Sequence, residues 1–412
     1  SVNGFALPQD IYANGASANG MLGWGLCTSD LNEDGNDDVV AGQIEMDFTT
    51  ETGTGPGSVL IWWGSTRVNA SADLTLSEGS SGDMFGYSVS STGDLNGDGH
   101  LDLVVGAPRN IENTNNPGRA YIYYGYGNSS LPTSANVTLT GTDNGDGFGA
   151  VVHICGDVNN DGYDDVLVGA PGHNGTSDFD VGKAYVFYGG ASGVDTTADW
   201  TYEGKNEEDA LAYSGVGIQD ANDDDYGDLV IGVPLWDDGT TEDVGQALVF
   251  YGSSSGPSST PDVTIKGDTK GGLLGTDVAH GGDINNDGLN DMVIGAPHTH
   301  NGSLNSAGHI QVHFGDANGI SSTPAKVLRG WSADGDMGFS VGPGGDGNGD
   351  GYDDICTGDI TNEFTYVYYG GPDAKDPKVY VDNTEIWSSA GSYPGTERTD
   401  DFTDVLNNYI QT

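Results

Sequence analysis

The chain has 412 residues, 69 of them glycine, and a formal net charge of −50 from 62 acidic against 12 basic side chains. This charge excludes nucleic acid as a partner, because phosphate backbones are bound through lysine and arginine. No apolar run reaches the roughly 18 residues that a membrane-spanning helix needs. The length fits one large β domain or two smaller ones.

A nine-residue acidic pattern close to D-x-N-x-D-G-x-x-D recurs along the whole chain. Its copies are separated by 64, 63, 63, 63 and 63 residues, which indicates a repeat architecture. They begin at Asp30, Asp94, Asp157, Asp220, Asp283 and Asp346.

The residue types in this pattern are those that hold calcium. Ca²⁺ takes six to eight oxygen ligands, which positions 1, 3 and 5 of a tight loop can supply together with a main-chain oxygen at position 7 and a carboxylate at position 9. A glycine at position 6 permits the turn. The sequence therefore predicts about six Ca²⁺ ions, one per copy. The predicted ligands are Asp30, Asn32, Asp34, Asn36, Asp38, Asp94, Asn96, Asp98, His100, Asp102, Asp157, Asn159, Asp161, Tyr163, Asp165, Asp220, Asn222, Asp224, Tyr226, Asp228, Asp283, Asn285, Asp287, Leu289, Asp291, Asp346, Asn348, Asp350, Tyr352 and Asp354.

The fourth copy keeps the ligand positions but has Asp225 where the others have glycine. We expect a site there at a cost of about 1 kcal/mol for the left-handed backbone. The pattern is not an EF-hand, because that loop has twelve residues and lies between helices. The alternative is that such loops are merely good turns, and the repetition of all ligand columns favours the metal.

In chain order, each copy contributes four apolar runs typical of strands. In the second copy these runs are 84–89, 101–108, 120–125 and 137–141. The first and sixth copies are looser, with Gly23-Trp24-Gly25 at the start of one and Gly338-Phe339 at the start of the other. A further run at 4–7 looks like an isolated fourth strand.

The Phe-Gly and Gly-Ala-Pro sequences around the acidic loops, such as Phe148-Gly149 and Gly169-Ala170-Pro171, resemble the FG-GAP repeats of integrin α-subunit propellers. The resemblance covers about residues 1–371. It implies an all-β propeller with four-stranded antiparallel blades and calcium between strands 1 and 2 of each blade. Six copies predict six blades, with the N-terminal strand at 4–7 closing the last one.

Two features leave alternatives open. Integrin propellers have seven blades, so a degenerate seventh blade built from both termini is the alternative. Residues 372–412 carry none of the repeat columns and form a predicted C-terminal extension, with a strand at 378–382 leading out of the ring. A short helix at 399–410 would dock on the propeller or on another subunit or domain.

The 2–3 loops are long and varied, at 43–58, 109–119, 172–183, 235–246 and 298–308. A variable loop face on a rigid scaffold is where partners usually bind. We therefore expect a protein or glycan partner at the cell surface, or self-assembly.

The histidine, cysteine and tryptophan residues give weaker indications of function. His298, His300, His309 and His313 could form a transition-metal site, but solvated and cross-strand histidines are the expected interpretation. Cys27, Cys155 and Cys356 are expected to be buried free thiols. Trp62, Trp63, Trp236 and Trp331 could stack on sugars. Packing explains the first two, and Trp236 in a 2–3 loop is the better ligand candidate.

No hydrolase or P-loop motif occurs, so a catalytic role is not expected. The sequence predicts an extracellular, calcium-binding adhesion or structural module. The alternatives are a lectin-like propeller or the non-catalytic part of a secreted hydrolase. Five sequons also favour an extracellular location. They are Asn69, Asn128, Asn136, Asn174 and Asn301.

Overall fold

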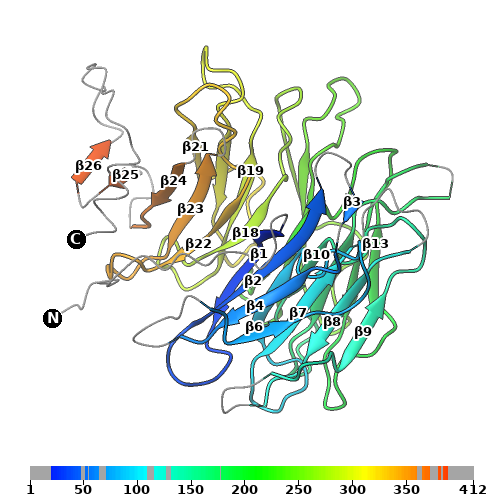
Figure 1. Ribbon diagram of the computed structural model, residues 1–412. Coiled ribbons are helices and arrows are strands. Elements are labelled where there is room, and N and C mark those ends of the chain that lie inside the picture. Colours follow the sequence, from blue (N-terminus) through cyan, green and yellow to red (C-terminus); the bar gives the residue numbers. More distant parts are fainter. Residues whose placement is uncertain are drawn as a thin grey trace.

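Six antiparallel sheets follow one another along the chain in a computed structural model (Figure 1). The residues that it describes are 20–47, 52–53, 55–64, 71–108, 116–126, 131–176, 178–359, 364–371, 379–381 and 384–387. No helix occurs among them. The sheets are the blades of an all-β, six-bladed propeller, as the repeat count predicted.

The strand bounds show the same order in every blade. Blade 1 contains β1 (Gly20–Ser29), β2 (Asp38–Asp47), β3 (Thr52–Gly53), β4 (Ser58–Trp62) and β5 (Leu74–Leu76); blade 2 contains β6 (Val89–Gly93), β7 (Asp102–Ala107), β8 (Arg119–Tyr123) and β9 (Val137–Thr140). Blade 3 contains β10 (Val151–Ile154), β11 (Val166–Ala170), β12 (Lys183–Phe187) and β13 (Trp200–Glu203); blade 4 contains β14 (Ser214–Gln219), β15 (Asp228–Val233), β16 (Gln246–Phe250) and β17 (Val263–Lys266). Blade 5 contains β18 (Val278–Gly282), β19 (Asp291–Ala296), β20 (His309–His313) and β21 (Lys326–Arg329); blade 6 contains β22 (Val341–Gly345), β23 (Asp354–Asp359), β24 (Phe364–Tyr368), β25 (Val379–Val381) and β26 (Thr384–Trp387).

Neighbouring blades pack face to face, and this explains the continuous apolar runs of the second strands. All six residues of β15, for example, are buried, because blades 3 and 5 cover its two faces. Five apolar cores of this kind join blade 1 to 2, 2 to 3, 3 to 4, 4 to 5 and 5 to 6. Burial against the next blade is thus the main apolar contribution to stability.

The FG and GAP columns mark the closest backbone approach between blades. The amide of Phe148 in blade 3 donates to the carbonyl of Pro117 in blade 2 at 3.0 Å, and the Phe148 ring packs edge-on against Tyr185 at 5.2 Å. The GAP glycine Gly106 lies so close to blade 3 that a Cβ there would be 2.1 Å from the Gly149 carbonyl oxygen. Glycine at position 106 is therefore required for this contact, whereas the FG column also accepts Ala212 in blade 4, whose carbonyl oxygen would lie 2.6 Å from a Cβ on Gly169.

The structure corrects the alignment of the sixth copy. Gly308 of blade 5 bridges to Met337, just as Gly118 bridges to Phe148, so the buried Met337 takes the place of the phenylalanine. Phe339, which the sequence pattern favoured for this role, is 45% exposed. Met337-Gly338 is therefore the FG equivalent of blade 6.

The outer edge of blade 6 is formed by the C-terminal segment. β25 pairs with β24 through Val379 and Tyr368, and β26 pairs with β25. A strand was predicted at 378–382, but the expectation that it leads out of the ring was wrong, because β25 takes the place next to β24 in the sixth sheet. The predicted N-terminal strand at 4–7 and the helix at 399–410 lie outside the described residues. The first 2–3 loop is also partly a hairpin, since β2 continues to Asp47 and pairs with β3.

Candidate calcium-binding loops

Each acidic repeat forms the loop between the first and second strands of its blade, so all six loops lie at the same end of the antiparallel sheets. Within each loop, hydrogen bonds link the residues at positions 1, 3 and 5. These contacts give the predicted site its shape, and calcium itself remains a prediction.

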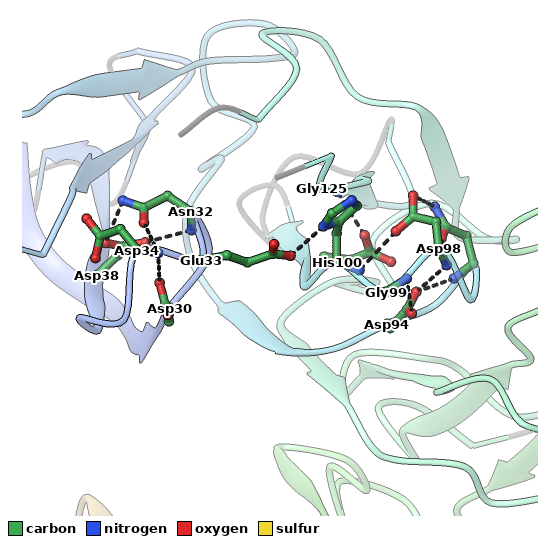
Figure 2. Close-up of polar contacts among 12 residues, drawn as sticks. Asp30, Asn32, Glu33, Asp34, Asp38, Asp94, Asp98, Gly99, His100 and Gly125 are labelled. Atoms are coloured by element: carbon green, nitrogen blue, oxygen red, sulfur yellow. Dashed lines mark hydrogen bonds and ion pairs between the residues drawn. The ribbon is translucent and has the colours of Figure 1, made fainter. Parts of the chain in front are cut away.

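The second loop shows the pattern in full (Figure 2). Asp94 at position 1 accepts from the amides of Gly97 and Asp98 through Oδ1, at 2.7 and 3.2 Å, and from the Gly99 amide through Oδ2 at 2.8 Å. Asn96 Oδ1 accepts from the Asp98 amide at 2.9 Å, and Asn96 Nδ2 donates to Asp98 Oδ2 at 3.0 Å. The oxygens of positions 1, 3 and 5 are therefore held on the inner side of one short loop.

The position-9 aspartates have a second role that the spacing did not reveal. Asp102 is fully buried and accepts through Oδ2 from the Leu95 amide and through Oδ1 from the Gly125 amide, both at 2.8 Å. It thus joins the calcium loop to the chain after the third strand, and each oxygen keeps a further lone pair for a cation. The same two-way contact is made by Asp38, Asp165, Asp228, Asp291 and Asp354.

Burial raises the pKa of these carboxyl groups well above the usual value for aspartate. The pKa is about 7 for Asp102, Asp228 and Asp291 and about 8 for Asp165; the amide donors oppose the shift, and the aspartates at positions 1 and 5 add to it. A divalent cation in the loop would remove this penalty by pairing with the ionised carboxylates. The loops are therefore electrostatically unfavourable without a cation at neutral pH.

The stability of the calcium-free fold and the affinity for calcium are expected to depend on pH in opposite directions. In EGTA the folded state binds more protons than the unfolded state wherever the folded pKa exceeds the unfolded value of about 3.9. These groups therefore stabilise the calcium-free fold below about pH 4, and that stability is lost as the pH rises through 7. Calcium affinity should instead fall on acidification, because protons compete for the ligands. Urea titrations from pH 5 to 8, in EGTA and in saturating Ca²⁺, measure how the free energy of unfolding changes with pH in each condition. The same change in both conditions would contradict the expectation.

Position 6 has the left-handed backbone that the glycine column predicted. Its φ is +87° at Gly99 and +94° at Gly162, and Asp225 adopts +68° in the fourth loop. Position 4 is left-handed as well, for example +57° at Glu33 and +54° at Asn160. That second constraint was missed, although glycine, asparagine and aspartate at position 4 in most copies were a signal for it.

Replacing Asp225 with glycine is expected to raise the free energy of unfolding by about 1 kcal/mol, because glycine adopts this backbone without strain. The reverse change Gly162→Asp should lower the free energy of unfolding by a similar amount. Open space surrounds Gly162, so the cost comes only from its left-handed φ. Urea denaturation in calcium measures both variants. A D225G protein less stable than the wild type would show that the Asp225 side chain contributes something other than strain.

One orphaned atom supports the fit to a cation. Asn222 Oδ1, at position 3 of the fourth loop, is buried and has no hydrogen-bond partner among the described residues. In the other loops the equivalent oxygen accepts from the position-5 amide, as Asn159 does at 2.9 Å. A buried acceptor without a donor is costly, and a cation at the loop centre would satisfy it.

Neighbouring loops are also linked to one another. Asp164, at position 8 of the third loop, accepts from the Asp94 amide at 2.8 Å, and its own amide donates to the Asp94 carbonyl at 3.2 Å. Asp353 and Asp283 repeat both contacts between the sixth and fifth loops. Figure 2 shows Glu33 of the first loop reaching His100 of the second.

The predicted histidine cluster is organised by hydrogen bonds. Buried His309 and His313 both contact Gln311, at 3.3 and 3.2 Å, and burial lowers the pKa of each to about 4. They are therefore buried histidines of one strand, while His298 and His300 are exposed in the loop, in agreement with the expected cross-strand and solvated histidines. Within the described part of the chain, the four histidines form no group of three potential metal ligands.

The three cysteines are free thiols; Cys155 is buried, and Cys27 and Cys356 are partly buried. Trp62 is buried, in agreement with its predicted packing role. Trp236 is half-buried, with Lys266 Nζ 4.8 Å from the ring centroid.

The described sequons differ in the exposure and hydrogen bonding of their asparagine side chains. Asn136 and Asn174 are exposed, whereas Asn301 is half-buried and donates through Nδ2 to the Gly330 carbonyl at 2.9 Å. Asn136 Oδ1 accepts from the Tyr124 amide as Asp199 does from Tyr188, so this asparagine belongs to a structural column. Asn69 and Asn128 lie outside the described residues.

Comparison with known proteins agrees with this geometry. A family model described as FG-GAP repeat matches residues 85–123, 148–187 and 274–313. These segments run from the inter-blade bridge residue to the end of the third strand in blades 2, 3 and 5. The chain is an FG-GAP repeat β-propeller. Blade 4 departs from the repeat by carrying Leu211-Ala212 in place of Phe-Gly.

The propeller is similar to integrin α chains and to a phospholipase. Integrin alpha-5 of Xenopus laevis is 33% identical over 229 residues, which is 51% of this chain and 21% of the relative. Phosphatidylinositol-glycan-specific phospholipase D of Homo sapiens is 28% identical over 298 residues, 67% of this chain and 35% of the relative. Integrin alpha pat-2 of Caenorhabditis elegans is 28% identical over 281 residues, 67% of this chain and 18% of the relative. The propeller thus spans about a fifth to a third of these proteins. None of its described residues forms a helix suited to crossing a bilayer.

Proposed function

We propose that the propeller is an extracellular, calcium-stabilised interaction module that mediates adhesion or assembly at a cell surface. In this proposal each of the six loops holds one structural Ca²⁺, and residues 1–371 form the functional unit together with β25 and β26 of the sixth sheet. The 2–3 loops, at the opposite end of the blades, bind the partner. The chain itself carries no catalytic activity.

The observation that supports this proposal most strongly is that hydrogen bonds link the residues at positions 1, 3 and 5 in six equivalent loops, with the Asn222 oxygen left unsatisfied. Similarity to integrin α chains favours a protein partner. Similarity to a phospholipase fits a propeller that accompanies a catalytic unit in another protein.

A pull-down from the native cell surface in millimolar Ca²⁺ tests the adhesion role. The expected result is a partner that is captured in Ca²⁺, released by EGTA and lost when the 2–3 loops of blades 3 and 4 are shortened. Electron microscopy of the pure protein tests self-assembly in parallel. Capture that survives loop shortening would place the partner elsewhere and contradict the proposed binding face.

A carbohydrate ligand is the second candidate function, supported by a groove of about 360 Å³ between blades 3 and 4. Tyr202 and Trp236 lie along it, and Lys205 and Lys266 each lie over one of these rings, at 5.8 and 4.8 Å. Aromatic faces beside hydrogen-bonding groups suit a sugar ring. On a glycan array, Trp236→Ala should abolish binding that Trp331→Ala retains; an array without any calcium-dependent signal would exclude this candidate.

A further inference from the structure

A second group of potential metal ligands lies at the opposite end of the strands from the calcium loops. Asp143 and Asp146 lie in the segment between β9 and β10, and His173 follows β11, so two separate segments supply the three side chains. One potential ligand atom of each lies within 4.8 Å of the others. No other group of this kind occurs in the described part of the chain.

The burial of this group calls for a partner. Asp146 is fully buried, and its Oδ1 atom has no hydrogen-bond partner among the described residues. Its other oxygen, Oδ2, lies 2.9 Å from Nδ1 of His173, which is itself 5% exposed. A buried carboxylate oxygen without a donor is rare in native proteins, and an absent ion or water is the usual explanation.

At the equivalent positions in the neighbouring blades, the buried aspartate has a different kind of side chain beside it. Asp83 in blade 2 and Asp209 in blade 4 also lie two residues before the inter-blade bridge and are buried. Arg119 lies 3.5 Å from Asp83, and Asn206 donates to Asp209 at 2.8 Å. In blade 3 the residue in the place of Asn206 is a second carboxylate, Asp143. Two carboxylates and an imidazole, without an arginine or amide between them, suit a cation.

We propose that Asp143, Asp146 and His173 bind a divalent cation of the zinc class. The imidazole distinguishes this site from the all-oxygen calcium loops, because nitrogen together with carboxylate ligands favours Zn²⁺ or Co²⁺ over Ca²⁺. At metal–ligand distances of about 2.0–2.2 Å the ligand atoms would lie about 3.3 Å apart. Asp143 is exposed and can close the remaining distance.

The charged groups around the site fit one cation. Glu203 Oε2 lies 3.4 Å from His173 Nε2, so it can orient the ring from the far side, as carboxylates do behind metal-bound histidines. Lys183 Nζ lies 3.4 Å from the same Glu203 oxygen and is paired with it. The bound metal would join the segment between blades 2 and 3 to the 2–3 loop of blade 3.

Metal titrations of the full chain test the site, with Ca²⁺ kept in excess so that the calcium loops do not compete. Isothermal titration with Zn²⁺ should show one site, and Co²⁺ should give visible absorption bands typical of nitrogen and oxygen ligands. His173→Gln should abolish these bands. Asp143→Asn, at an exposed position that does not threaten folding, should weaken Zn²⁺ binding about tenfold or more. His298→Gln is the matched control, because it removes an exposed histidine outside the group, and it should bind like the wild type.

Thermal scans supply a readout that does not depend on the titration. Zn²⁺ should raise the Tm of the wild type and of His298→Gln but not that of Asp143→Asn. Absence of Zn²⁺ binding in excess Ca²⁺ would overturn the assignment. So would Co²⁺ bands that persist in both His173→Gln and Asp143→Asn, since the metal would then lie elsewhere.

Discussion

Removing calcium with EGTA should lower the Tm of the propeller by roughly 10 °C or more. Each site that binds only the folded state adds about 2.7 kcal/mol at a hundredfold excess over Kd. Six such sites would together match or exceed the 5–15 kcal/mol that typically separates a folded domain from its unfolded state. Without the cation, each loop also keeps a buried carboxyl group, such as Asp165, beside further acidic side chains. Calorimetric scans in EGTA and in millimolar Ca²⁺ measure the difference.

Two controls accompany this experiment. Adding Ca²⁺ back in excess over EGTA should restore the original Tm, which separates metal removal from irreversible damage. Asp98→Asn, which removes one ligand charge from one loop, should lower the Tm by only a fraction of the full effect. An unchanged Tm in EGTA would contradict a structural role for calcium.

The substitution Gly106→Ala should destabilise the propeller by about 3 kcal/mol or more. The new Cβ would lie 2.1 Å from the Gly149 carbonyl oxygen of the next blade, so the backbones of blades 2 and 3 would have to separate. Overpacking of this kind usually costs about 1–3 kcal/mol, and a backbone atom cannot move aside as a side chain does. Urea denaturation in calcium measures the loss.

The matched control occupies the same column in the last blade. Nothing lies within 4 Å of a Cβ built on Gly358, so Gly358→Ala should change the free energy of unfolding by only about 0.5 kcal/mol. Equal stability of the two variants would show that the GAP glycine is not set by the inter-blade contact. It would then have to be explained by the conformation of its own strand.

The sequence predicted the features that depend on local chemistry. The period of the acidic loops, the four apolar runs per copy and the left-handed backbone at Gly99 follow from residue types within a few positions of one another. The left-handed, strained backbone conformation of Asp225 was predicted for the same reason. The six blades followed because a repeat with two apolar faces must stack on its neighbours.

Features that depend on contacts between distant segments were not visible in this way. Phe339 and Met337 flank the same glycine, and only the bridge from Gly308 in the preceding blade decides which of them is buried. Likewise, nothing in the sequence places His173 beside Asp143 and Asp146, because it lies 27 residues after Asp146, beyond two further strands. The two-way contact of Asp102 needed the position of Gly125, which lies in a different loop.

Anomalous diffraction from crystals grown in Ca²⁺ tests the central claim most directly. We predict six calcium peaks, one inside each acidic loop, each coordinated by oxygens of positions 1, 3, 5 and 9 and by the carbonyl of position 7. The peak in the fourth loop should lie beside Asn222 Oδ1. Loops that remain without calcium at saturating concentration, with Asp102 and its equivalents bonded only to backbone amides, would contradict the account.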